Sequence, residues 1–220
     1  MNSFSKIFLI VIINLFIGNY LYSQYKFGIQ AGAGISNYVG ADFSSDNDPK
    51  IRMTAGMYFE REINYTLSFG FEVNYEKKGT FYRFYPDGSK TVSVDSRLSY
   101  LTLPIYTKAY FGKNANYYMY LGVSASYLTD YQSSTWATEY GFTIPNPYFT
   151  YTYNTWDASV IGGVGLNFYE VILDIRYHHG IVDIFKGKNV PSIRNSFISA
   201  TIGYSLYKKK QISCFNNRAY

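Results

Sequence analysis

The stretch VILDIRYH, residues 171–178, alternates between two kinds of side chain along its whole length. Successive side chains of a β-strand point to opposite faces, so every second residue shares a face. Val171, Leu173, Ile175 and Tyr177 would therefore form an apolar face, and Ile172, Asp174, Arg176 and His178 would form a mostly charged one. The pattern predicts a strand that separates an apolar environment from a polar one.

Seven further segments repeat this alternation, with Gly, Ser, Thr or charged residues on the face opposite the apolar one. They are Tyr25–Ile35, Ile51–Arg61, Tyr65–Glu76, Leu98–Phe111, Tyr117–Tyr127, Trp156–Phe168 and Phe197–Leu206. Alternating segments of about ten residues, separated by turn residues, are typical of transmembrane β-barrels. A soluble sandwich would show the same alternation, so the pattern alone leaves both open.

The lengths of the links between these segments favour a barrel. Short links, at 62–64, 112–116 and 169–170, alternate with long links at 36–50, around Pro86, at 131–155 and at 181–196. Bacterial barrels have short periplasmic turns and long extracellular loops. We therefore predict an all-β fold, an eight-stranded antiparallel up-and-down transmembrane β-barrel.

Aromatic residues make up 20% of the chain and gather near the short links. Aromatic rings are enriched where a membrane protein crosses the interface between headgroups and hydrocarbon. The predicted periplasmic aromatic girdle consists of Phe59, Tyr65, Phe111, Tyr117, Phe168 and Tyr169.

Charged residues on the polar faces predict an interior network. Its expected members are Arg52, Glu72, Lys108, Asp157, Asp174 and Arg176. Buried charges must be paired to offset their desolvation. We expect Arg176 and Lys108 to pair with Glu72, Asp174 or Asp157, inside a lumen that side chains fill.

The N-terminus has the features of an export signal. Lys6 precedes an apolar run, residues 7–17, which is about half the length needed to span a bilayer. We predict a signal peptide at 1–23, a barrel at 24–207 and a basic periplasmic tail at 208–220. The expected location is the outer membrane of a Gram-negative cell, with the signal cleaved.

Charge and cysteine content exclude several other classes. The formal net charge is +5, and Lys208, Lys209, Lys210 and Arg218 supply four of these positive charges. The rest of the chain has no basic field suited to nucleic acid. A single cysteine, Cys214, cannot make a disulfide within the chain.

Four sequence pieces resemble the outer-membrane β-barrel family often called PorT-like or porin-family proteins, which share their shape with the OmpA barrel domain. The pieces are FGIQAG at 27–32, YLTLPI at 100–105, GGVGL at 162–166 and IGYSL at 202–206, and the resemblance covers residues 25–207. It implies an eight-stranded outer-membrane barrel, usually without an assigned activity; one member type supports protein secretion.

Two other features of the sequence could support chemistry. His178-His179, near the outer end of its strand, suggests either a lipid acyl-transfer site or a rim histidine paired with interior carboxylates. The segment Asp42–Asp48 suggests either a Ca²⁺ site or a solvated loop, and it lacks EF-hand spacing. We expect no catalytic residue, metal or cofactor.

A protruding hairpin is expected between the third and fourth predicted strands. Alternation resumes at 80–85, a turn follows at Pro86–Ser89, and a β-branched strand returns at 91–95. Both strands are longer than the 9–11 residues that a membrane crossing needs. Pro104, which lacks a backbone donor, suggests a bulge in the fourth strand.

These features lead to three functional hypotheses. The first is a non-enzymatic barrel with a structural or partner-binding role through its outer loops and this hairpin. The alternatives are a narrow porin-like channel for small solutes and a rim enzyme that modifies lipid A. The expected partners are outer-membrane lipids, the barrel-assembly machinery and a protein at the outer loops, with no nucleic acid.

Overall fold

The computed structural model describes residues 25–40, 47–84, 91–112, 116–139, 142–145, 152–187 and 192–208. The predicted signal peptide and the tail beyond Lys208 lie outside these residues. Within them the chain forms a single sheet of strands: β1 (Tyr25–Val39), β2 (Asn47–Asp48), β3 (Lys50–Glu62), β4 (Leu67–Lys78), β5 (Phe81–Phe84), β6 (Thr91–Phe111), β7 (Tyr117–Glu139), β8 (Phe142–Pro145), β9 (Trp156–Phe168), β10 (Val171–Gly180) and β11 (Arg194–Lys208). No helix among the described residues is long and apolar enough to cross a membrane.

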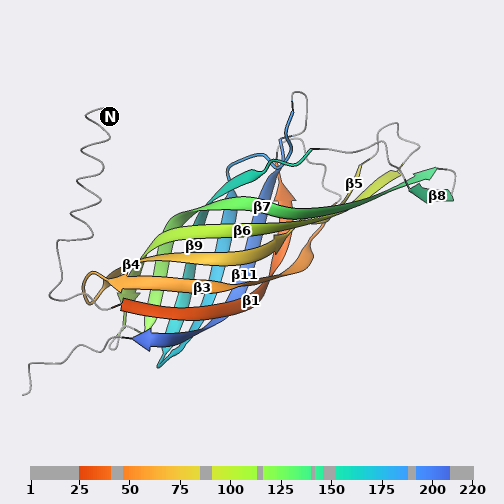
Figure 1. Cartoon of the computed structure of the whole chain (residues 1–220). Coiled ribbons are helices and arrows are strands. Elements are labelled where there is room, and N and C mark those ends of the chain that lie inside the picture. Colours follow the sequence, from red (N-terminus) through yellow and green to blue (C-terminus); the bar gives the residue numbers. More distant parts are fainter. Residues whose placement is uncertain are drawn as a thin grey trace, which may run out of the picture.

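Eight of these strands close into an antiparallel barrel, as predicted. The order β6-β4-β3-β1-β11-β10-β9-β7 is completed by pairing between β6 and β7, which joins the two ends of the sheet (Figure 1). Each barrel strand pairs with its neighbours in the chain, and β1 pairs with β11. This is an up-and-down barrel, and closure leaves no free edge within the bilayer.

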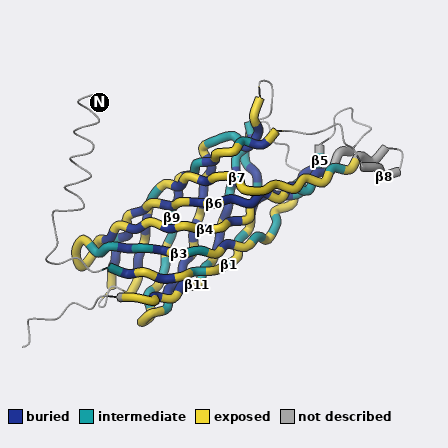
Figure 2. The backbone as a smooth tube through the Cα atoms, in the orientation of Figure 1, coloured by how far each residue is buried: buried dark blue, intermediate teal, exposed yellow. Residues whose placement is uncertain are grey.

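The two faces of the sheet have the predicted parity. Along β4 and β10 exposed and buried residues alternate without interruption, with Phe71 and Leu173 exposed and Glu72 and Asp174 buried. Figure 2 shows exposed residues alternating with buried or intermediate ones along the strands at the front of the barrel. An apolar exterior around a polar interior is the inverse of a soluble sandwich, so the barrel crosses a membrane.

Tight turns join the strands at one end. The β9–β10 link is only Tyr169 and Glu170, and Tyr169 has a positive φ of 56°. Gly112, which follows β6, has a φ of 90°, a conformation that a residue without a Cβ adopts freely. The β3–β4 turn is longer than predicted, because β4 begins at Leu67 rather than at Tyr65.

At the other end β6 and β7 continue past the rim, and the short strands β5 and β8 pair with them there. The predicted pairing between the 80–85 and 91–95 segments is confirmed, because Phe81 pairs with Asp95 and Phe84 with Val92. The predicted turn between them lies outside the described residues. The fifth predicted strand ended too early, because β7 continues from Tyr127 to Glu139, pairs with β6 up to Thr138 and pairs with β8 from Trp136 to Glu139.

A bulge explains why the sequence pattern concealed this continuation. Thr129 has no partner across the β6–β7 ladder, since Tyr100 pairs with Leu128 and Ser99 with Asp130. An extra residue reverses the side-chain parity beyond it. The predicted bulge at Pro104 was wrong: β7 pairs through that position in one register, and the β4–β6 register is the same on both sides of it.

Candidate functional site

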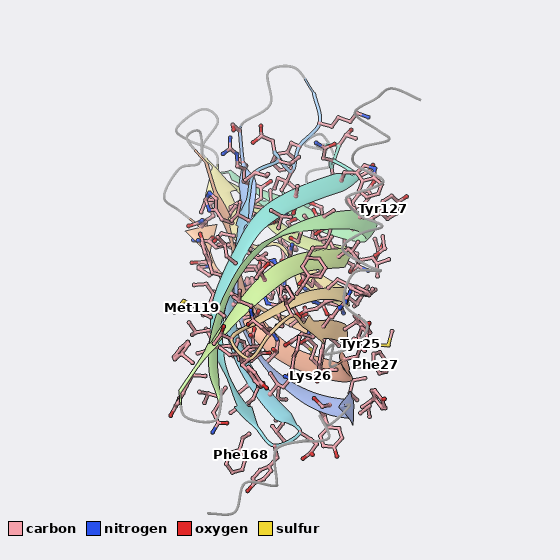
Figure 3. The ribbon with its side chains drawn as sticks, turned by 90° about the vertical axis from the view of Figure 1, so that its left-hand side faces the viewer. Tyr25, Lys26, Phe27, Met119, Tyr127 and Phe168 are labelled. Atoms are coloured by element: carbon pink, nitrogen blue, oxygen red, sulfur yellow. The ribbon has the colours of Figure 1, made fainter. Side chains whose placement is uncertain are left out.

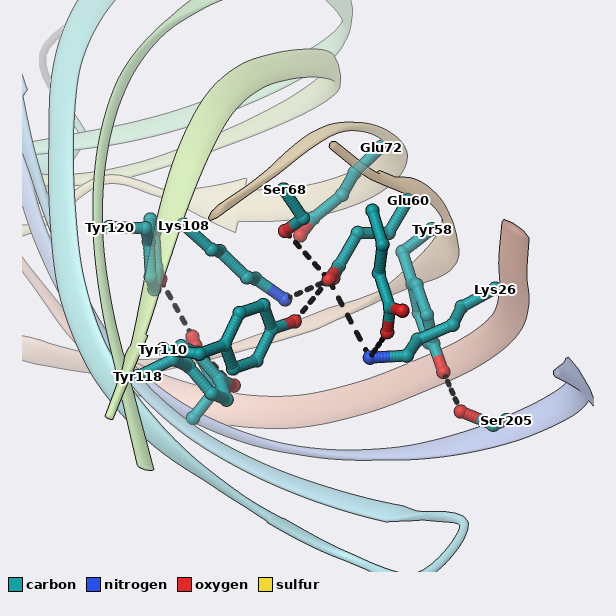
Figure 4. A network of polar contacts seen from close by, with 12 residues as sticks. Lys26, Tyr58, Glu60, Ser68, Glu72, Lys108, Tyr110, Tyr118, Tyr120 and Ser205 are labelled. Atoms are coloured by element: carbon teal, nitrogen blue, oxygen red, sulfur yellow. Dashed lines mark hydrogen bonds and ion pairs between the residues drawn. The ribbon is translucent and has the colours of Figure 1, made fainter. Parts of the chain in front are cut away.

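The lumen is filled by three layers of charged and tyrosine side chains. The layer nearest the tight turns centres on Glu60, which is fully buried (Figure 4). Lys108 Nζ lies 2.8 Å from Glu60 Oε2, and Ser68 and Tyr110 donate hydrogen bonds to Oε1. Lys26 lies 3.9 Å from the same oxygen and 2.7 Å from Glu62. Two cations thus balance two carboxylates in this layer.

The middle layer joins opposite walls of the barrel. Arg176 on β10 donates two hydrogen bonds to Glu72 on β4, at 2.6 and 2.7 Å. Its Nε donates to the Tyr120 hydroxyl at 2.6 Å, and Tyr120 in turn donates to Asp174 at 2.8 Å. Gln30 also donates to Glu72. Such a bidentate pair, satisfied on every side, fixes the geometry of the layer.

The outer layer lies towards the long loops. Lys78 Nζ is 3.2 Å from Glu76 and 3.8 Å from Asp157, and Asn195 donates to Asp157 at 2.9 Å. His178 Nε2 lies 3.7 Å from Glu76, and its ring packs against Phe197. His178 therefore lies in the interior beside a carboxylate.

The six predicted network residues fall into different groups. Arg176, Glu72 and Asp174 come together in the middle layer, with Arg176 Nε 3.4 Å from Asp174. Lys108 pairs with Glu60, and Asp157 lies beside Lys78. Neither Glu60 nor Lys78 was among the predicted members. The sixth residue stands apart, because Arg52 lies 3.6 Å from Asp95 near the outer end.

Four interior charges lie outside the predicted network: Lys26, Glu60, Glu76 and Lys78. The alternation places the first three on the polar face of their predicted strands, and Lys78 lies on the same face two residues past the predicted end at Glu76. Lys26 lies directly across from Glu60 on adjacent strands, whereas Lys108 reaches Glu60, and Asp157 reaches Lys78, from strands that are not neighbours in the sheet. The strand pattern does not reveal those contacts.

An apolar cap covers the outer layer. It is a cluster of buried residues from β1, β5, β6 and the segments 152–155, 181–187 and 192–193: Tyr38, Tyr82, Val94, Leu98, Tyr100, Tyr153, Ile184, Phe185 and Ile193. Tyr153 forms an isolated bridge with Phe185, and their rings lie 5.4 Å apart. The cap separates the polar lumen from the exterior.

The predicted girdle residues lie near the tight turns. Figure 3 places Phe168 at the opposite end of the barrel from Tyr127. The rings of Phe111 and Tyr117 stack 5.9 Å apart, and those of Phe168 and Tyr169 meet edge-on at 4.9 Å. Tyr65 is 82% exposed, while Phe59 packs between the rings of Tyr25 and Phe71.

The second rim histidine has a different setting from the first. His179 lies on the exposed face of β10, directly across from Ser196 on β11. The Tyr177 hydroxyl stands between them, 3.2 Å from His179 Nδ1 and 3.3 Å from Ser196 Oγ. The described residues hold no group of three His, Cys, Asp or Glu placed to bind a metal, and residues 42–46 of the acidic segment lie outside them.

The closed barrel, its apolar exterior and its charged interior define an integral β-barrel protein of the outer membrane. The chain belongs to the outer membrane protein beta-barrel domain family, whose family model matches residues 14–186. A search of curated protein sequences finds no significant match.

Solved structures with similar folds are outer-membrane barrels. Neisserial surface protein A is 16% identical, with a TM-score of 0.46 over 82% of this chain and 97% of that one. Ail of Yersinia pestis is 10% identical, with a TM-score of 0.44 over 84% and 100%. OprG of Pseudomonas aeruginosa is 10% identical, with a TM-score of 0.40 over 84% and 95%.

Proposed function

We propose that this protein is a non-enzymatic barrel of the Gram-negative outer membrane that binds a protein partner through its outer ribbon. The outer ribbon comprises β2, β5, residues 91–99 of β6, residues 130–139 of β7, and β8. In this proposal the signal peptide is removed on export. Outer-membrane lipids and the barrel-assembly machinery are the other expected partners.

The observation that carries the proposal is the reach of the ribbon. β6 has 21 residues and β7 has 23, about twice what a membrane crossing needs. Figure 1 shows both strands running well past the rim, with β5 and β8 alongside them. A barrel with a purely structural role does not need an ordered sheet of this length outside the membrane.

Free strand edges suggest how a partner would bind. β2 and β8 are the end strands of the sheet order among the described residues, and β2 pairs with only two residues of β5. Unpaired backbone groups at such edges accept an added strand from another chain. We therefore favour β-augmentation by an extended segment of the partner.

The filled lumen argues against the channel alternative. A solute would have to break the Arg176–Glu72 pair and also displace the apolar cap. Both layers consist of side chains that are almost completely buried. Small barrels of eight strands have an interior just wide enough for such side chains.

The proposal is tested by site-specific photocrosslinking in intact cells. A photoreactive residue at exposed Gln132 on the outer ribbon should give a discrete adduct with another protein, and one at Leu121 on the membrane-facing side should not. The purified protein should give no conductance steps in planar bilayers. Steady conductance steps without an adduct at Gln132 would favour the channel instead.

A second candidate function rests on the rim cluster of Tyr177, His179 and Ser196. A serine and a histidine on the membrane-facing side could act on a lipid ester if the histidine activated the serine. We rank it second because Ser196 donates to Tyr177 rather than to His179. Lipid A mass spectra should be identical with wild type and with Ser196→Ala; a product that only the wild type makes would support the enzyme.

A further inference from the structure

Buried polar atoms without a hydrogen-bond partner gather in one band of the lumen. Among the described residues, ten buried side-chain nitrogen or oxygen atoms have no such partner, and seven of them belong to this band. They come from Lys78, Ser124, Asp157, Ser159, His178 with both ring nitrogens, and Asn195. Each of these residues is at most 4% exposed.

The strand pairing places these residues close together. Ser124 on β7 lies directly across from Ser159 on β9, and Asp157 is two residues further along the same face. Asn195 reaches Asp157 from β11, and Lys78 lies 3.8 Å from it on the opposite wall. The band thus receives side chains from five strands: β4, β7, β9, β10 and β11.

Two closed layers bound the band. The Arg176–Glu72 pair and Tyr120 lie on the inner side, and Leu98 and Tyr100 of the apolar cap lie on the outer side. The layer around Glu60 differs, because none of the partnerless atoms belongs to Lys26, Glu60 or Lys108. The deficit is therefore concentrated in the band, since only three partnerless atoms among the described residues, from Arg52, Asp95 and Tyr106, lie elsewhere.

We propose that this band is a binding site for a cluster of internal water molecules. Buried polar groups in folded proteins are almost always satisfied by protein or by ordered water. The groups in the band are mixed: Asp157 and Asn195 offer acceptors, Lys78 has three donors and only two ion-pair neighbours, and the serine hydroxyls both donate and accept. A bare metal ion would satisfy only the acceptors and an anion only the donors, whereas water both donates and accepts hydrogen bonds.

A hydrated compartment in this position lies between the ion-pair layer and the apolar cap. The cap alone separates it from the outer side, whereas the Arg176–Glu72 layer and the layer around Glu60 both separate it from the side of the tight turns. This inference does not depend on the outer ribbon or on a partner.

The first test uses the wild-type chain refolded in deuterated detergent micelles. Magnetisation transfer from water should reach the amides of Ser124, Asp157 and Ser159 through long-lived bound water. The amide of Ser68 is the control, because its hydroxyl is bonded to Glu60 in the inner layer. Absence of transfer at all three positions would overturn the proposal.

The second test asks whether replacing a serine in the band raises or lowers the stability of the barrel. Ser159→Val removes a hydroxyl and adds a methyl group at a fully buried site. In a hydrated band it displaces water from Asp157 and should lower the urea midpoint by about half a molar. In a dry band it would remove an unsatisfied group, so a raised midpoint contradicts the proposal. Ser133→Val, on the exposed part of β7, calibrates the effect of the substitution itself.

Discussion

Arg176 and Glu72 are 104 residues apart in the chain and form a bidentate ion pair across the lumen. Both side chains are at most 4% exposed. The pair links β10 to β4, which are not neighbours in the sheet, and so it ties together opposite walls of the barrel.

Removing one member of this pair should be strongly destabilising. Arg176→Met leaves Glu72 buried without its cation, and breaking a buried pair in this way costs about 3–5 kcal/mol. Urea unfolding in lipid vesicles measures the loss. Arg97→Met, on an exposed arginine of the outer ribbon, is the matched control and should change stability by less than about 0.5 kcal/mol. Equal effects of the two substitutions would show that the interior pair does not support the barrel.

Depth in the membrane should set the cost of a charge on the outer face. Ile175 lies in the middle of β10 and is 58% exposed, while Ile181 lies just past the end of that strand and is 52% exposed. Ile175→Arg should cost about 2–4 kcal/mol, and Ile181→Arg about 0–1 kcal/mol. The fraction of folded barrel after membrane insertion, read from its migration on unheated gels, reports the difference. Similar yields for both variants would mean that this face does not contact lipid.

Two glycines of β9 should respond in opposite ways to alanine. A Cβ at Gly165 would overlap the ring of Tyr118, which donates to Asp174, whereas at Gly162 the nearest atoms are 3.7 Å away. Gly165→Ala should therefore cost about 1–3 kcal/mol through overpacking. Gly162→Ala should stabilise the barrel by about 0.5–1 kcal/mol, because alanine costs less backbone entropy on folding. Urea midpoints test both signs, and a neutral Gly165→Ala would show that Tyr118 can move freely.

Amide hydrogen exchange should find the outer ribbon ordered. The amides of β6 and β7 between Ser93 and Leu98 and between Tyr131 and Trp136 lie in a continuous ladder beyond the rim. They should exchange far more slowly than the exposed turn at Gly112, because exchange requires the ladder to open. Exchange as fast as in that turn would remove the ordered surface that the proposed partner binding needs.

The sequence by itself determined the strands and their two faces. Alternation in VILDIRYH, at 171–178, and in the seven other segments follows from the two-residue period of a strand, and it requires no knowledge of neighbours. The alternating link lengths then predicted the up-and-down order, because a two-residue link such as Tyr169-Glu170 can only join adjacent antiparallel strands.

Only the tertiary structure decided which interior charges meet. Lys108 pairs with Glu60 and Arg176 with Glu72 because the tilt and closure of the barrel bring these side chains to the same level along its axis. Side-chain parity gives the face on which a residue lies but not its level along the axis. The continuation of β7 was likewise hidden, because the bulge at Thr129 reverses the alternation on which the prediction rests. Side-chain parity is a local property of each strand, whereas pairing across the lumen depends on the register of all eight.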